Sequence, residues 1–321
     1  MNIPLKLKPA FKDYIWGGTK LRDEFNKKCD FQKISESWEL SCHKDGNSII
    51  ENGPDAGSSL ADYIQKYGKS ILGTNCVKFD NLPVLIKLID AKDNLSVQVH
   101  PANDYALSTE SEYGKTEMWY IVDCEENSSL LYGFKKNITK EEFTQRIENN
   151  TLLEVTKSVP VKKGDVFFIE AGTLHAIGKG ILIAEIQQNS NTTYRIYDYG
   201  RTDKDGNGRE LHIKKACDVT KLCPAVPYPH NPEEKYSGYS QRLLSSCEYF
   251  TVNSLDVSYS ACLTADEKSF CHILLIDGSC TLRSDSYDDI KLIKGDSVFI
   301  PAGFGNFHID GLCKLIKTHI D

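Results

Sequence analysis

The sequence lacks the features that mark membrane, secreted and nucleic-acid-binding proteins. Its most apolar stretch, Leu82–Ile89, is short and contains Lys87, so it cannot span a bilayer. The start of the chain carries no long apolar run that would act as a secretion signal. The formal net charge of −7 argues against a nucleic-acid-binding surface, which is usually basic. We therefore expect a cytoplasmic protein whose partner is neither a membrane nor a nucleic acid.

Cysteine is present, but without the spacing that disulfide frameworks and cysteine-type zinc sites need. The 11 cysteines are odd in number and widely spaced, and no Cys-X-X-Cys pair occurs. Reduced thiols are the simplest interpretation, and they agree with a cytoplasmic location. With 40% hydrophobic and 26% charged residues among 321, the chain has the composition of one large or two ordinary globular domains.

The chain is predominantly strand and turn. Short runs of β-branched and aromatic residues recur between clusters of Gly, Asp and Asn. The predicted strands include Val84–Ile89, Met118–Val122, Val166–Ile169, Ile181–Ile186, His272–Ile276 and Ser297–Ile300. Three helices are predicted, at Ser59–Tyr67, from the Thr139–Glu142 capping box to about Asn149, and at His212–Val219. Many short strands and few helices favour a β-sandwich or β-barrel.

An internal repeat organises these strands. Lys163–Gly172 aligns without gaps with Lys294–Gly303, and each segment holds a Gly-Asp turn, a strand and an Ala-Gly turn. The preceding strands also correspond, Glu117–Asp123 with Cys271–Asp277. We infer that the chain holds two copies of one β unit. The proline-rich stretch Cys223–Lys235 is the predicted connection between them.

Four polar residues of the first copy have the chemistry of a divalent-metal site. Gln98 and His100 are two residues apart on a predicted strand, so their side chains share a face. Glu117 begins another strand, and His175 follows an Ala-Gly turn. Two imidazoles, a carboxylate and an amide oxygen suit zinc or a similar divalent ion, with positions left for solvent or substrate.

The second copy keeps the scaffold of the repeat without these ligands. Cys271 stands where the first copy has Glu117, and Asn306, with His308 nearby, stands where it has His175. No Gln-X-His sequence occurs in the second copy. We expect this pattern if the first copy holds a metal and the second copy is structural.

Seven short motifs run in order through the first copy. They are Tyr14–Gly18 (YIWGG), Glu36–Ser41 (ESWELS), Lys87–Ala91 (KLIDA), Leu95–Pro101 (LSVQVHP), Gly114–Trp119 (GKTEMW), Ala171–Ala176 (AGTLHA) and Tyr194–Tyr199 (YRIYDY). The repeated Gly-Asp and Ala-Gly turns resemble those of cupin β-barrels. The motifs and their order resemble the type I mannose-6-phosphate isomerases in their short bacterial form. One departure is Glu170, where such turns commonly have proline, as the second copy does at Pro301.

The resemblance implies two cupin-type (jelly-roll) β-barrels or sandwiches with a few short helices. Residues 1–222 would form a metal-binding catalytic domain with helical insertions, 223–235 a linker, and 236–321 a degenerate second domain without metal. The resemblance also implies one zinc ion per chain, bound by Gln98, His100, Glu117 and His175, and a catalytic role for Arg195. The implied reaction interconverts D-mannose 6-phosphate and D-fructose 6-phosphate through an enediol(ate).

Aldose–ketose isomerisation needs a base, a group that stabilises the developing oxyanion, and an anchor for the phosphate. Arg195 can stabilise the enediolate or bind the phosphate with its forked guanidinium. Lys115 shares a face with Glu117, so it can bind phosphate, carry a proton, or simply be solvated. Glu185 lies mid-strand among apolar residues, where a carboxylate can act as the base or pair with a cation. A water held by the metal is a third candidate base. Trp16 fits either the sugar site or the core.

Three other classes of function compete with the isomerase. An iron-dependent cupin oxygenase could use a similar site but would not need a phosphate-directed arginine and lysine. A non-catalytic sugar-phosphate-binding cupin would be marked by a missing ligand or a missing Arg195, and neither is missing. A structural double barrel would not explain why the ligand residue types occur in only one copy.

Overall fold

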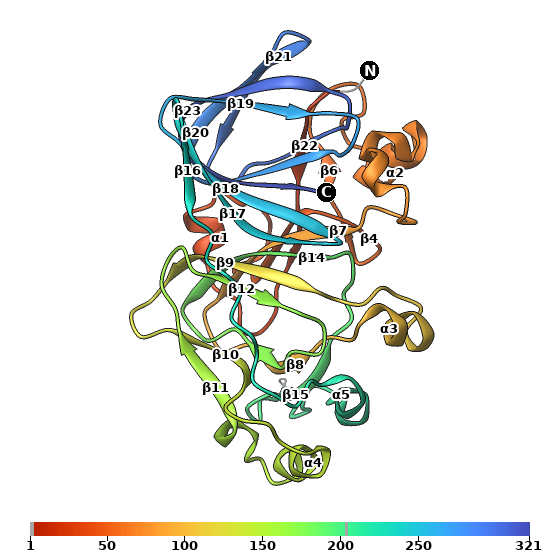
Figure 1. Cartoon of the computed structure of the whole chain (residues 1–321), viewed down its shortest axis with the longest axis vertical. Helices are drawn as coiled ribbons and strands as arrows, with labels where there is room; N and C mark the ends of the chain where they lie inside the picture. Colours follow the sequence, from red (N-terminus) through yellow and green to blue (C-terminus); the bar gives the residue numbers. More distant parts are fainter. Residues whose placement is uncertain (1–2, 203–204) are drawn as a thin grey trace. The chain divides into compact units, whose positions relative to one another are not determined.

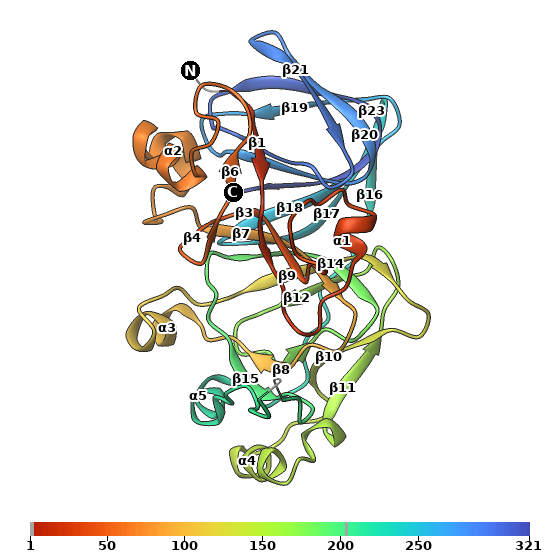
Figure 2. The same ribbon diagram turned by 180° about the vertical axis from the view of Figure 1, so that it is seen from behind.

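The computed structural model describes residues 3–202 and 205–321 and is mainly β (Figures 1 and 2). Contacts group the chain into two compact units, each described by itself below. Unit 1 comprises the segment up to Tyr14, Thr19–Ile89 and Pro229–Asp321, and unit 2 comprises Ile15–Gly18 and Asp90–Tyr228. This grouping places N-terminal segments with the second copy of the repeat. The domain ranges 1–222, 223–235 and 236–321 stay a prediction about the two repeated domains.

Unit 1 is built on a ten-stranded sheet in which N-terminal strands extend the second copy of the repeat. The strand order is β16-β17-β18-β23-β20-β22-β1-β6, with β19 pairing β23 and β21 pairing β20. β1 (Leu5–Lys8) runs antiparallel to β22 (Ser297–Ile300), with Leu5 opposite Phe299. The other strands are β6 (Ile49–Ile50), β16 (Glu233–Tyr236), β17 (Tyr239–Cys247), β18 (Phe250–Val257), β19 (Ser260–Ala265), β20 (Cys271–Ser284), β21 (Tyr287–Ile293) and β23 (Gly305–His319).

The rest of unit 1 consists of short strands and helices from the N-terminal part of the chain. β2 pairs with β3, and β3 pairs with β7, whose last two residues belong to unit 2. The strands are β2 (Ala10–Lys12), β3 (Glu36–Leu40), β4 (Cys42–His43), β5 (Gly46–Asn47) and β7 (Val84–Ala91), and the helical segments are α1 (Lys20–Asp23), α2 (Leu60–Tyr67), η1 (Lys69–Leu72) and η2 (Thr74–Cys76).

Unit 2 contains all the predicted site residues, most of them on or next to two sets of strands. One set is a five-stranded sheet in the order β11-β10-β13-β8-β15, and the other pairs in the order β12-β9-β14. The strands are β8 (Val97–Val99), β9 (Glu117–Cys124), β10 (Ser129–Phe134), β11 (Thr156–Pro160), β12 (Val166–Ile169), β13 (His175–Ala176), β14 (Ile181–Gln188) and β15 (Tyr194–Tyr197). The helices are α3 (Asn103–Thr109), α4 (Lys140–Glu148), η3 (Leu152–Glu154) and α5 (Ile213–Val219).

The predicted strands and helices are confirmed, and their ends follow from local chemistry. Ser59 caps α2 by accepting a hydrogen bond from the backbone amide of Asp62 at 3.0 Å. Thr139 caps α4 in the same way through the amide of Glu142 at 3.1 Å. The short helices α1 and α3 were not predicted. Among the described residues, no helix is long and apolar enough to cross a membrane.

The repeat predicted from sequence has the same backbone geometry in both copies. Ile169 lies opposite Glu117 on β12 and β9, and Ile300 lies opposite Cys271 on β22 and β20. Gly164 and Gly295 adopt positive φ angles of 92° and 97°, which residues with a Cβ rarely adopt. In each turn the following Asp accepts a hydrogen bond from the backbone three residues before it, at 2.9 Å. The Gly-Asp turn therefore serves as scaffold in both copies.

Candidate metal centre and active site

On three neighbouring strands of the five-stranded sheet, Gln98, His175 and Arg195 lie side by side as register partners. β13 pairs with β8 so that His175 lies opposite Gln98. β15 pairs with the other edge of β8 so that Arg195 also lies opposite Gln98. Directly opposed residues of an antiparallel pair point to the same face of the sheet. Gln98 lies on β8 as predicted, whereas the strand ends at Val99 and His100 is the residue that follows it.

Glu117, from the other set of strands, lies next to the two histidines. It is the first residue of β9, and its carboxylate lies 3.8 Å from Nε2 of His100 and 3.5 Å from Nε2 of His175. All three side chains are buried, with exposed fractions of 1% or less. Donor atoms from the three residues lie within 4.8 Å of one another, which makes them a group that could hold a metal ion. Tetrahedral zinc ligands lie roughly 3.4 Å apart, so the spacing to Glu117 fits.

The hydrogen bonds made by Nδ1 of each histidine determine which way its Nε2 lone pair points. Nδ1 of His100 lies 2.9 Å from the carbonyl oxygen of Thr192, and Nδ1 of His175 lies 2.8 Å from that of Thr173. A carbonyl only accepts, so each Nδ1 must carry the proton and each Nε2 is left as a ligand atom. Burial lowers the pKa of His175 to about 4, which keeps its ring neutral near pH 7. The residues present therefore fit a divalent metal.

Gln98 lies at the edge of this group. Its amide nitrogen is 3.4 Å from Nε2 of His175, and the side chain is only partly buried. The oxygen and nitrogen of an amide exchange places on a half-turn of the side chain, which would present the oxygen to the same point. Gln98 is thus placed as predicted, and its role as a ligand stays a prediction.

Lys115 and Glu185 both lie beside the cluster. Nζ of Lys115 is 2.9 Å from one oxygen of Glu117 and 3.6 Å from one oxygen of Glu185. The other oxygen of Glu185 accepts a hydrogen bond from the indole nitrogen of Trp119 at 2.9 Å. The side chains of Lys115, Glu117 and Glu185 are all 5% exposed or less. The site therefore combines two carboxylates, one ammonium and two imidazoles in a space largely shielded from solvent.

Arg195 lies in a positively charged part of unit 2. Its Nη1 donates to the carbonyl oxygen of Glu210 at 2.9 Å. Burial and the neighbouring guanidinium of Arg209 lower the pKa of Arg195 from its usual value. Arg209 and Arg201 both bind the carboxylate of Asp198, the former at 2.6 Å. The charges of three guanidiniums and of only two carboxylates, Asp198 and Glu210, therefore act in this region, which leaves it able to attract an anion.

Trp16 is buried, with 4% of its surface exposed. Its carbonyl oxygen accepts a hydrogen bond from the amide of Asp93 at 3.1 Å, which ties the YIWGG segment to the residues that follow β7. A role for Trp16 in sugar binding stays a prediction.

Two contributors to the site were not predicted from sequence. Trp119 orients Glu185 and also packs edge-on against His175, with ring centroids 5.3 Å apart. Its signal was available, because Trp119 is two residues from Glu117 on one strand and therefore shares its face. Thr192, whose carbonyl fixes His100, had no such signal, because only the backbone of a distant turn is used.

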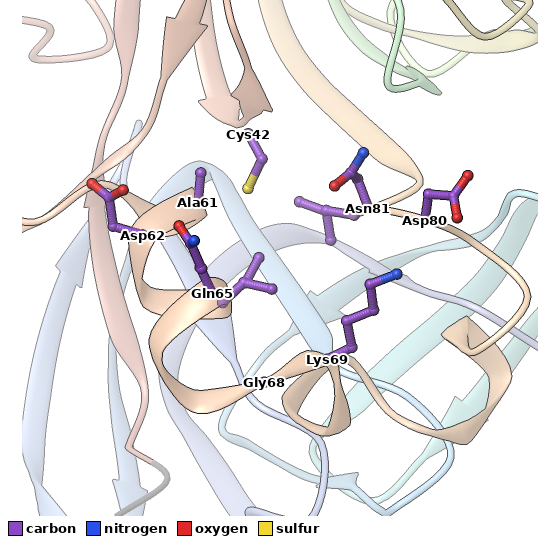
Figure 3. Close-up of a pocket in the computed structure, with 10 residues that line it drawn as sticks. Cys42, Ala61, Asp62, Gln65, Gly68, Lys69, Asp80 and Asn81 are labelled. Carbon is purple, nitrogen blue, oxygen red and sulfur yellow. The ribbon is translucent and has the colours of Figure 1, made fainter.

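Unit 1 contains a hollow of about 450 Å³, and none of the predicted site residues lines it (Figure 3). Cys42 from β4, Gln65 from α2 and Lys69 from η1 face this hollow, together with Asn81. It offers neither a histidine nor a cluster of metal-ligating groups. This hollow therefore does not hold the predicted chemistry, whose donor atoms lie in unit 2.

Comparison with known proteins places the chain in a family. It is 40% identical over 319 residues to the mannose-6-phosphate isomerase ManA of Bacillus subtilis, covering 99% of each chain. The chain belongs to the type I mannose-6-phosphate isomerase family. The family model for the type I phosphomannose isomerase catalytic domain matches residues 4–127, and that for the mannose-6-phosphate isomerase cupin domain matches residues 240–320.

Other mannose-6-phosphate isomerases match almost the whole chain. The mannose-6-phosphate isomerase of Streptococcus mutans is 36% identical over 323 residues, covering 99% of each chain. A crystal structure of the mannose 6-phosphate isomerase from Bacillus subtilis superimposes with a TM-score of 0.92 at 37% identity, covering both chains completely. The predicted cupin-type, mainly β fold is therefore confirmed.

Proposed function

We propose that this protein is a zinc-dependent isomerase that interconverts D-mannose 6-phosphate and D-fructose 6-phosphate through an enediol(ate). The observation that carries the proposal is the buried group of His100, Glu117 and His175, with Lys115 and Glu185 against it, in a chain of this family. We also propose that the enzyme is cytoplasmic, which agrees with cysteines that lack the spacing of a disulfide framework, and that it acts on a free sugar phosphate.

His100, Glu117 and His175 would hold the metal, with Gln98 as a further ligand. We assign zinc because two neutral imidazoles and one carboxylate are a common ligand set of catalytic zinc sites. Bound there, the ion would supply a Lewis acid that polarises the carbonyl and hydroxyl oxygens of the sugar.

Arg195 would hold the anionic end of the substrate. Its guanidinium is close enough to those of Arg201 and Arg209 for their charges to act on it, and a phosphate would relieve their mutual repulsion. Arg195 also lies opposite Gln98 in the sheet, so an anion bound to it would be one strand away from the metal ligands. This placement would direct the reacting carbons, C1 and C2, toward the cluster. Trp16 and Lys115 are the other proposed substrate contacts.

Lys115 and Glu185 would handle the proton that moves between C2 and C1. The two side chains are 3.6 Å apart and buried, so the Glu185 carboxylate could take the proton from C2 and return it to C1 beside the ammonium of Lys115. The ammonium of Lys115 would also stabilise negative charge on the enediolate oxygens. The indole of Trp119 holds the second oxygen of Glu185, which leaves the first oxygen on the side of Lys115.

The decisive experiment measures fructose 6-phosphate formed from mannose 6-phosphate before chelation, after chelation and after zinc is restored. We expect activity that disappears with the metal and returns with it. No activity in any state, with the fold intact, would contradict the proposal. The metal that copurifies would then separate a sugar-phosphate-binding protein from an iron oxygenase.

A further inference from the structure

One carboxylate outside the metal cluster is connected to it through a turn of the backbone. The turn Ser190–Thr192 joins β14 to β15, and its last carbonyl accepts the Nδ1–H of His100 at 2.9 Å. The position of this carbonyl decides whether the Nε2 lone pair of His100 faces the other ligands. Whatever holds the turn in place therefore acts on the metal site.

Glu112 holds this turn from the segment that follows α3. One oxygen of its carboxylate accepts hydrogen bonds from the hydroxyl of Thr192 at 2.7 Å, the amide of Asn191 at 3.2 Å and the hydroxyl of Ser190 at 3.4 Å. Hydrogen bonds to an ionised carboxylate are about twice as strong as those between neutral groups. A single charged group thus engages each of the three residues of the turn.

The same turn is also held from the strand side. Gln187, which lies opposite Glu117 on β14, donates its amide hydrogens to the carbonyl oxygens of Gln188 and Ser190 at 2.7 and 2.6 Å. The backbone that fixes His100 is therefore tied both to the register partner of Glu117 and to Glu112. The turn that fixes His100 is thus anchored on the strand that pairs with the strand of Glu117.

We propose that Glu112 is a positioning residue for the metal site, acting through Thr192 on the orientation of His100. The inference rests on the proposed function, since it assumes that His100 binds a metal. It assigns to Glu112 no contact with substrate or metal. Its loss should let the turn move and the ring of His100 rotate away from Glu117 and His175.

The experiment measures binding of Co²⁺ to the metal-free full-length protein by competition with a chelator, together with the visible spectrum of the cobalt-loaded protein. Glu112→Gln and Thr192→Val should each weaken Co²⁺ binding by about 10- to 100-fold, the range found for outer-shell partners of metal ligands, and change the cobalt spectrum. Thr192→Ser keeps the hydroxyl, so its Co²⁺ affinity and cobalt spectrum should match those of the wild-type protein. Because Thr192→Val removes only one hydroxyl from a half-buried residue, it remains informative if Glu112→Gln fails to fold.

Glu110 provides the matched control. Its carboxylate lies two residues earlier and binds Tyr194 at 2.8 Å and Lys215 at 2.7 Å rather than the turn. Glu110→Gln should leave Co²⁺ affinity and the cobalt spectrum unchanged. Unchanged binding in both test variants, or an equal loss in Glu110→Gln, would overturn the inference while leaving the proposed function intact. A wild-type protein that binds no Co²⁺ would overturn both.

Discussion

The two copies of the repeat share the same turns and strands but differ in the side chains at the positions of the metal-ligand candidates. Three residues after the Ala-Gly turn, the first copy has His175, which is fully buried among the metal-ligand candidates. The matching residue of the second copy is Asn306, whose exposed side chain accepts a hydrogen bond from Thr264 at 2.7 Å. At the head of the preceding strand, Glu117 is matched by Cys271, a buried thiol whose pKa burial raises to about 11. The turns therefore specify the fold, and the residues beside them specify the site.

The second copy has a buried histidine of its own, which clarifies what the first copy adds. His272 is fully buried and bonds Ser297 through Nε2 at 2.8 Å, and the hydroxyl of Ser297 donates to the carbonyl oxygen of Glu39. Nε2 of His272 bonds a hydroxyl, whereas Nε2 of His175 faces a carboxylate and a second imidazole. Burial alone therefore does not identify a metal ligand. The groups that face the ring nitrogen, here a carboxylate and a second imidazole, do.

The largest expected effect separates these two histidines. His175→Ala should lose bound metal and reduce turnover by roughly a thousandfold or more, because the metal's charge stabilisation contributes several kcal/mol. The fold should be retained, since the Ala171–Gly172 turn is untouched. Metal content, turnover and circular dichroism test this. His272→Ala is the control: it should lower the free energy of unfolding by about 1–3 kcal/mol and leave metal content unchanged. A metal-replete, active His175→Ala protein would refute the ligand assignment.

Two buried lysines, one in each unit, make the next comparison. Lys115→Met leaves Glu117 and Glu185 without that ammonium, and should destabilise the metal-free protein by about 3–5 kcal/mol. Bound zinc should reduce this loss, because the cation compensates Glu117. Lys27 lies 2.7 Å from Glu39, a carboxyl whose pKa burial raises. Lys27→Met should also destabilise, by an amount that does not change with zinc.

Denaturant titrations with and without zinc measure both lysine variants. Equal losses for Lys115→Met in the two conditions would show that Lys115 is structural, as Lys27 is. If the stability loss of Lys27→Met changed with zinc, the buried lysine of unit 1 would also be coupled to the metal, and the contrast between the two lysines would be wrong.

Local patterns predicted much of this fold and part of the site. The caps Ser59 and Thr139, the Gly-Asp turns and the strands were readable, because each depends on neighbouring residues. The pairing of Leu5 with Phe299 was not, because no local pattern indicates a partner so distant in sequence. The ligand set came from the repeat and the family resemblance. The link from Glu112 through Thr192 to His100 was invisible, since it uses a backbone carbonyl.

A smaller effect concerns the pH dependence of stability. Burial, with a contribution from Lys27, lowers the pKa of His272 to about 3, from 6.5 in the unfolded chain. Between these two pH values the unfolded state binds a proton at His272 that the native state does not bind. The free energy of unfolding therefore falls as the pH is lowered from about 6.5 toward 3. One such group contributes up to about 1.4 kcal/mol per pH unit in this range. His272→Asn should flatten the dependence by that amount in denaturant titrations of the metal-free protein at several pH values. An unchanged slope would mean that His272 is accessible to protons in the native state.

The smallest effects test whether the two units are stabilised by equivalent local devices. Ser59 in unit 1 and Thr139 in unit 2 each accept one backbone hydrogen bond at the start of a helix, at 3.0 and 3.1 Å. Loss of such a cap costs about 1 kcal/mol, so Ser59→Ala and Thr139→Ala should each lower the free energy of unfolding by about that amount. Neither change touches a metal ligand, so Co²⁺ affinity should stay constant in both. If Thr139→Ala alone weakened Co²⁺ binding, the metal site would depend on the stability of unit 2 as a whole. The weaker binding expected for Glu112→Gln would then need to be compared at equal stability.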